Sequence, residues 1–134
     1  MSIQIKLIRN NIKRSSSFGK YFAKVVSQSE VTLKELAKEA SRNSSLRESD
    51  VIAVVTELED MMQQRLSDGQ TIVLKGIGRF RLSVESEGVD RPSDFNIKKH
   101  IRRILCRFLP ASRRNNDGTL TYNFSENVKV EWQK

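Results

Sequence analysis

The sequence predicts an α+β fold in which two helices lie under an antiparallel sheet that extends into a β-ribbon arm. Residues 32–40 and 45–66 place apolar side chains at helical spacing. Residues 71–74 are typical of a short strand, and residues 79–84 and 97–109 alternate between apolar and polar side chains, as half-buried strands do. A chain of 134 residues suits one domain. We therefore expect a single domain, with residues 31–110 as its body and arm.

Residues 1–30 are predicted to form a β-hairpin extension ahead of this body. Ile3, Ile5 and Leu7 share one parity, which indicates a first strand. The following residues are polar and include three consecutive serines, so we expect a loop, and residues 21–26 are typical of a second strand. A disordered basic tail is the alternative, but the alternation disfavours it.

Capping boxes mark the start of both predicted helices. In such a box, a Ser or Thr and a Glu three residues later satisfy each other's free backbone N–H groups. Thr32 and Glu35 form the first box, and Ser45 and Glu48 form the second. Gly69 is expected to end the second helix.

The second helix has a broad apolar surface. At about 100° per residue, its apolar positions cover roughly 180° of the cylinder. That is more than packing within one short chain requires, so we expect a homodimer. The apolar positions are Val51, Ile52, Val54, Val55, Leu58, Met61, Met62 and Leu66.

Basic residues are sorted onto one side of the predicted sheet. Phe80, Leu82 and Val84 share one parity in the first strand. Ile104, Cys106 and Phe108 share one parity in the returning strand, and five basic residues of the two strands have the other parity. Because side chains alternate between the two faces, strand pairing puts five cations opposite the core. Such an array repels itself and is favourable mainly against phosphates. The five residues are Arg79, Arg81, Lys99, Arg103 and Arg107.

Residues 111–134 are predicted to form a C-terminal β extension. The sequence Asn116-Asp117-Gly118 indicates a turn. Two alternating segments follow, at residues 120–124 and 128–132.

The chain is strongly basic, with a net charge of +8 and a pI near 9.9. Residues 1–29 hold six Lys/Arg and no acid, and residues 97–114 hold seven basic residues and no acid. This charge favours a polyanionic partner, namely nucleic acid or, less favoured, a membrane surface. A charge run is usually only a solvated face, but placement along one strand face favours a binding role.

Other function classes lack their signatures. No apolar run approaches the roughly 20 residues of a membrane span, and the N-terminus lacks the apolar block of a signal peptide, so we expect a cytoplasmic protein without membrane contacts. The single cysteine, Cys106, excludes an intrachain disulfide framework and a cysteine-based zinc site. Paired carboxylates, a phosphate loop and a Ser-His-Asp set are not visible. We expect no enzyme activity, metal, cofactor or small-molecule substrate.

The stretch from Leu66 to Phe80 resembles the HU and integration host factor family. In that family a helix ends at a glycine, an apolar strand follows, and a Gly-aromatic-Gly-x-Phe loop begins the DNA-facing sheet. Here Gly69, residues 71–74 and Gly76-Ile77-Gly78-Arg79-Phe80 have this order. The resemblance covers about residues 31–110. The N-terminal hairpin, with residues 86–90 and 96–99, looks more like the divergent HU-like branch common in Bacteroidetes.

The resemblance implies an intertwined homodimer whose two β-ribbon arms extend around the minor groove of DNA. In the family, a proline at the arm tip wedges between base pairs and kinks the duplex. Pro92, preceded by Arg91, is the candidate here, although the family's Arg-Asn-Pro tip is not reproduced. Acidic residues flank the tip and disfavour contact with phosphates, so the sequence does not decide whether Pro92 is inserted between base pairs. These acidic residues are Glu85, Glu87, Asp90 and Asp94.

Fourteen residues are candidates for contacts with DNA. The two glycines of the loop either permit a tight turn or let the backbone approach a phosphate, and both roles are compatible. Lys75 beside them is either a phosphate ligand or solvated. The candidates are Lys75, Gly76, Gly78, Arg79, Arg81, Arg91, Pro92, Lys98, Lys99, Arg102, Arg103, Arg107, Arg113 and Arg114.

Two functional hypotheses remain, and RNA binding is a weaker third because stacking aromatics on an exposed face are not evident. The first is a nucleoid-associated protein that binds duplex DNA largely without sequence preference and bends or condenses it. The second is a protein-interaction module on an HU-like scaffold that has weak or lost DNA binding. The acidic ribbon and the added terminal strands, whose edges can pair with a partner, motivate the second.

Overall fold

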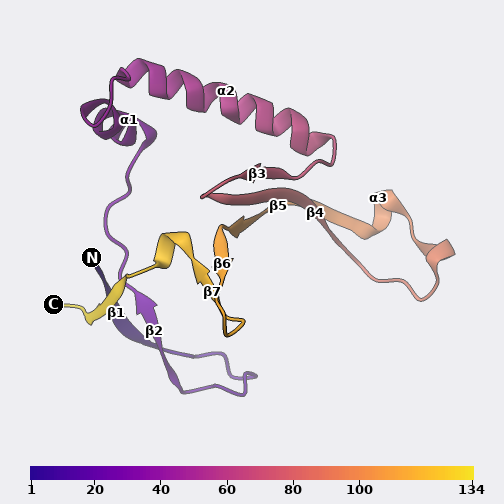
Figure 1. Cartoon of the computed structure of the whole chain (residues 1–134). Helices are drawn as coiled ribbons and strands as arrows, with labels where there is room; N and C mark the ends of the chain where they lie inside the picture. The colour runs from indigo at the N-terminus through magenta and orange to yellow at the C-terminus, as the bar shows by residue number, and fades with distance from the viewer. The chain divides into compact units, whose positions relative to one another are not determined.

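The computed structural model describes residues 1–134. The chain divides into two compact units, one of residues 32–124 and one of residues 1–31 with 125–134. Figure 1 labels the helices and most of the strands.

The helices of the larger unit begin at capped positions. Helix α1 (Leu33–Arg42) starts after Thr32, whose hydroxyl accepts the Glu35 N–H at 3.4 Å while the Glu35 carboxylate accepts the Thr32 N–H at 2.8 Å. This confirms the first predicted box. Helix α2 (Glu48–Ser67) starts after Arg47, so the predicted box of Ser45 and Glu48 is wrong. The carboxylate of Asp50 accepts the Arg47 N–H at 3.0 Å and caps this helix two residues later than predicted.

Helix α2 contacts two strands of a three-stranded sheet, in the order β3 (Ile72–Leu74), β4 (Gly78–Ser86), β5 (Ile101–Pro110). Both pairings are antiparallel. Phe80 lies opposite Phe108, and their rings stack with centroids 4.7 Å apart. The predicted α+β class is therefore confirmed, with helices and antiparallel sheets in one mixed arrangement.

Strands β4 and β5 continue beyond β3 as a two-stranded ribbon, and a helical segment closes its outer end (Figure 1). A 3₁₀ turn, η1 (Pro92–Asp94), precedes a short helix, α3 (Ile97–His100). The prediction of a strand from residue 97 is therefore wrong for its first four residues. The side-chain oxygen of Asn96 accepts the N–H groups of Lys98 and Lys99, which favours a helical turn there. Lys99 consequently lies on α3 and not on the sheet face.

The ribbon contains a bulge. Glu85 lies opposite Arg103, whereas Ser86 lies opposite Ile101, so Arg102 is an extra residue on β5.

A second hairpin follows, formed by β6 (Ser112–Arg114) and β7 (Leu120–Tyr122). The predicted turn between them is confirmed, since the Gly118 N–H donates to the Asn115 carbonyl at 3.0 Å. A 3₁₀ turn, η2 (Asn123–Ser125), comes next.

The smaller unit is a three-stranded sheet. Strands β1 (Ser2–Arg9) and β2 (Tyr21–Val25) form the predicted N-terminal hairpin. Strand β8 (Lys129–Trp132) is parallel to β1 on its other side, with Ser2 opposite Lys129 and Ile5 opposite Trp132.

The chain encloses very little core by itself. Ala37 and Leu66 are its only buried hydrophobic side chains. On the apolar face of the β4–β5 ribbon, Val84 is 58% exposed and Ile104 is 66% exposed. A hollow of about 500 Å³ lies between α2 and β4, lined mainly by apolar side chains such as Leu58, Met62 and Leu82. None of the helices has the length and apolar character needed to cross a membrane.

Candidate nucleic-acid interface

The register of the ribbon places four arginines on one face of the larger sheet. Arg79 and Arg81 come from β4, and Arg107 and Arg103 come from β5. Arg81 lies directly opposite Arg107, and the stacked phenylalanines occupy the other face. The predicted sorting is confirmed for these four residues. We call this surface, at Arg79, Arg81 and Arg107, the basic base of the ribbon.

Three of these arginines line one hollow of about 440 Å³. Its other lining residues are Thr71, Phe108 and Leu109, and none of them is acidic. Like charges on directly opposed strand positions destabilise a sheet. The hollow is therefore electrostatically suited to an anion, which would relieve the repulsion.

A second hollow, of about 480 Å³, adjoins the glycine loop. Lys75, Arg79 and Arg113 line it together with the backbone of Gly76 and Gly78. Because Arg79 lines both hollows, the basic surface is continuous from the base of the ribbon to the start of β6.

The two glycines of the loop meet different steric conditions. Gly76 has φ +88° and open space where a Cβ would lie, so its requirement is conformational. Gly78 has φ +152°, and a Cβ there would overlap the Leu109 carbonyl and the Phe108 ring. The Ile77 N–H donates to the Leu74 carbonyl at 3.0 Å, which closes the turn. The turn-forming role of this loop is thus present, and phosphate approach at Gly76 is sterically open.

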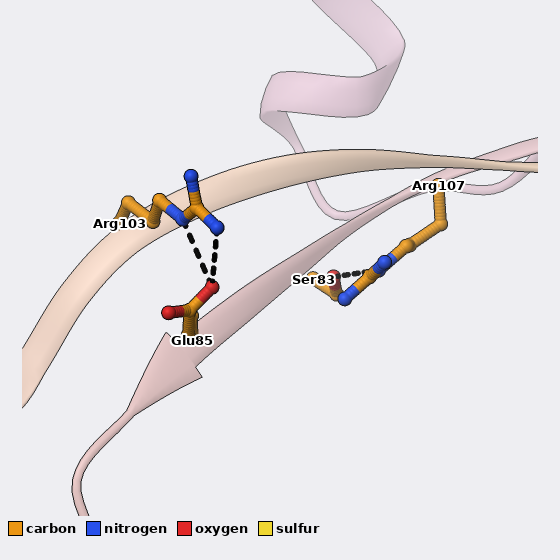
Figure 2. Close-up of polar contacts among 4 residues, drawn as sticks. All are labelled: Ser83, Glu85, Arg103 and Arg107. Atoms are coloured by element: carbon orange, nitrogen blue, oxygen red, sulfur yellow. Dashed lines mark hydrogen bonds and ion pairs between the residues drawn. The ribbon is translucent and has the colours of Figure 1, made fainter. Parts of the chain in front are cut away.

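The outer ribbon carries arginines whose charges are compensated. Arg103 forms an ion pair with Glu85 at 2.9 Å, as Figure 2 shows. Arg102 pairs with Glu87 at 3.3 Å. By contrast, Arg107 donates to the neutral hydroxyl of Ser83 at 3.2 Å (Figure 2). We call the segment of Glu85, Glu87, Arg102 and Arg103 the paired arm.

The remaining candidates lie at the arm tip and on the second hairpin. Pro92 is exposed at the first position of η1, and Arg91 before it pairs with Asp94 at 3.4 Å. Lys98 and Lys99 are exposed on α3, away from the sheet. Arg114 is exposed at the end of β6.

The acidic residues of the arm are evident in the sequence, but their ion-pair partners are not. Glu85 has the parity of Arg81, so it belongs to the same face. The cross-strand partner of Glu85 becomes visible only once the register opposite β5 is known.

The sequence matches the model of a protein family described as "HU domain fused to wHTH, Ig, or Glycine-rich motif", over residues 1–119. The fold is similar to the crystal structure of a "Putative bacterial DNA binding protein" from Bacteroides vulgatus ATCC 8482, with a TM-score of 0.61 and 10% identity. That match covers 98% of this chain but 47% of the other, so the chain spans about half the length of its neighbour. No curated protein matches the sequence. The extent of the family match and the order of helices, glycine loop and ribbon place this chain in the HU-like family.

Proposed function

We propose that this protein binds duplex DNA, largely without sequence preference, through phosphate contacts from the basic base of the ribbon and from the arm. The observation that carries the proposal is the hollow at Arg79, Arg81 and Arg107, which three arginines line and no acidic residue does. Guanidinium groups bind phosphate oxygens in a bidentate manner, and such contacts carry no base information. The family match and the name of the structural neighbour support the same class of partner.

The decisive experiment is a salt titration of binding to a random-sequence duplex. Wild-type protein is expected to bind at about 50 mM salt and to lose at least 10³-fold in affinity by about 200 mM if it makes six or more phosphate contacts. The variant Arg81→Gln/Arg107→Gln should lower the salt slope by about 1.8, since each phosphate contact contributes roughly 0.9. No binding by wild type at the lower salt concentration contradicts the proposal.

A matched control variant removes the same amount of positive charge from helix α1 instead of from the ribbon. Lys34 and Lys38 are exposed on α1, within residues 30–70, which hold five basic and nine acidic residues. The variant Lys34→Gln/Lys38→Gln should keep the wild-type slope. An equal reduction of the salt slope in both double variants would mean that binding depends only on the net charge of the protein.

The proposed binding unit is a homodimer. Large apolar patches left exposed on one chain mark an interface. The hollow between α2 and β4 and the exposed apolar face of the ribbon are such patches, and a second copy is the occupant that the HU-like resemblance implies. Sedimentation equilibrium should give twice the chain mass of 15.4 kDa. A stable monomer at micromolar concentration argues against this assembly.

The role we propose is binding alone, with no chemical step. Bending or condensation of DNA, and residence on the nucleoid in the cytoplasm, are parts of this proposal. Pro92 is the residue we assign to a kink, because it is exposed at the arm tip. A duplex labelled at both ends should show a shorter end-to-end distance on binding, and Pro92→Ala should restore it.

A protein-interaction module on the same scaffold is the second candidate. The ion pairs of the paired arm favour it, because compensated arginines attract phosphates weakly. On that hypothesis, charge reversal at Arg81, Arg103 and Arg107 leaves DNA affinity unchanged. On the first hypothesis, the same reversal abolishes binding.

A further inference from the structure

Charge is unevenly divided between the two units of the protein. The unit of residues 1–31 and 125–134 carries eight Lys/Arg and three Asp/Glu, a net charge of +5. The unit of residues 32–124 is more than twice as long and carries sixteen Lys/Arg and thirteen Asp/Glu, a net charge of +3. The smaller unit therefore has much the higher charge density, although none of the fourteen candidate DNA contacts belongs to it.

The β1–β2 hairpin accounts for this charge. Residues 1–29 hold six basic residues and no acid. Five of the six have exposed side chains that form no ion pair in the structure, and the sixth, Arg9, lies over the Phe18 ring with 5.6 Å to its centroid. The five are Lys6, Lys13, Arg14, Lys20 and Lys24.

The loop of the hairpin is held together by its own side chains. The Asn10 amide donates to the hydroxyls of Ser15 and Ser17 at 3.3 and 2.9 Å, and these two hydroxyls lie 2.9 Å apart. The Asn10 N–H donates to the Lys20 carbonyl at 2.8 Å and closes the base of the loop. A loop ordered before binding loses less conformational entropy on contact with a partner. This loop is therefore a pre-organised support for Lys13 and Arg14, unlike a loose basic tail.

The strands of the hairpin add an unfavourable charge pair. Lys6 lies directly opposite Lys24 in the register, and both side chains are exposed. Like charges at directly opposed positions destabilise a strand pair. A bound phosphate between or beside the two ammonium groups would remove that repulsion.

We infer that the β1–β2 hairpin is a second phosphate-binding element, which contacts the backbone of duplex DNA through Lys13, Arg14 and Lys20 of its loop and through the pair Lys6 and Lys24. The inference rests on the proposed DNA binding and adds contacts outside the ribbon and its arm.

The test compares the salt slope of wild type with that of Lys13→Gln/Arg14→Gln/Lys20→Gln. None of these three side chains makes a hydrogen bond or an ion pair that the loop needs, and Arg9 is left in place because it contacts Phe18. Loss of three phosphate contacts should lower the slope by about 2.7 and the affinity at about 0.1 M salt on the order of 10- to 100-fold. The variant Lys34→Gln/Lys38→Gln/Arg42→Gln removes the same charge from α1 and should keep the wild-type slope.

A second variant distinguishes binding from a structural role. Lys6→Gln/Lys24→Gln should lower the salt slope by about 1.8 and, at the same time, raise the melting temperature of free protein, because the opposed charges are removed. A variant that merely damaged the hairpin would lower the melting temperature.

Three results would each reject a different claim: the hairpin contact, the proposed function, or DNA as the partner of the hairpin. If the loop variant and the α1 control have equal salt slopes while Arg81→Gln/Arg107→Gln has a reduced slope, the hairpin contact is rejected and the proposed function is retained. Absence of wild-type binding at about 50 mM salt rejects the proposed function, and the hairpin contact with it. Loss of retention on phosphatidylglycerol vesicles by the loop variant, with an unchanged DNA slope, rejects DNA as the partner of the hairpin.

Discussion

The basic base of the ribbon and the paired arm present the same residue type in different electrostatic surroundings. At the base, Arg81 and Arg107 lie opposite each other with no carboxylate in the hollow that they line. Along the arm, Arg102 and Arg103 are each within 3.3 Å of a glutamate oxygen. A count of arginines along the ribbon would treat the two regions as equal, although the net charge that they present to a phosphate differs.

The difference indicates a division of labour within one ribbon. Uncompensated guanidinium groups attract phosphates at long range, whereas exposed ion pairs present almost no net charge and contribute little to stability. Within the ribbon, we therefore expect the base to contribute more to the affinity than the paired arm. The paired arm becomes cationic only if its glutamates are displaced or neutralised.

The largest expected effect comes from reversing charge at the base. Arg81→Glu/Arg107→Glu should lower affinity for a random duplex by about 100-fold or more at about 0.1 M salt, because two attractive contacts become repulsive. Fluorescence anisotropy with a labelled duplex measures this loss, and Lys34→Glu/Lys38→Glu on α1 is the charge-matched control. A base variant as tight as this control would remove the distinction between the regions.

Removing the carboxylates of the arm should have a smaller effect of opposite sign. Glu85→Gln/Glu87→Gln frees Arg103 and Arg102, so affinity should rise about 10-fold at about 0.1 M salt and the salt slope should steepen by up to roughly 1.8. The same titration provides the measurement. A decrease in affinity would show that these glutamates position the arginines for DNA and do not compete with it.

The smallest effect is expected when the pairs are removed whole. Glu85→Gln/Glu87→Gln/Arg102→Gln/Arg103→Gln leaves net charge unchanged, and exposed pairs of this kind contribute about 0–1 kcal/mol each. Affinity should therefore stay within about 2-fold of wild type, since few phosphate contacts are lost. Circular dichroism during thermal unfolding checks that the fold is retained. A loss as large as that of the base reversal would assign the arm an equal share of binding.

Local patterns predicted the parts of this fold that depend on nearby residues. The Thr32–Glu35 cap, the N-terminal hairpin and the turn at residues 116–118 follow from side chains a few positions apart. Strand parity predicted the shared face of Arg79, Arg81, Arg103 and Arg107 for the same reason, because alternation is a local property.

Two kinds of feature were not predictable from local patterns. One depends on residues far apart in the sequence, and the other on competition between a helical and a strand conformation at the same residues. Strand β8 pairs with β1 although the two lie at opposite ends of the sequence. The Glu85–Arg103 pair joins residues 18 positions apart and requires a known register. At Asn96, a side chain able to cap a helical turn outweighed the strand-like pattern that follows it.

The bulge at Glu85 and Ser86 affects the direction of the outer ribbon but not which strand residues pair with each other. Deletion of Arg102 would leave Arg103 opposite Glu85 and Ile101 opposite Ser86, so each side chain would keep its present face. What would change is the local bend and twist that an extra residue adds to one strand. A single codon at this point can therefore redirect the outer ribbon while the hydrogen-bonding partners on either side stay the same.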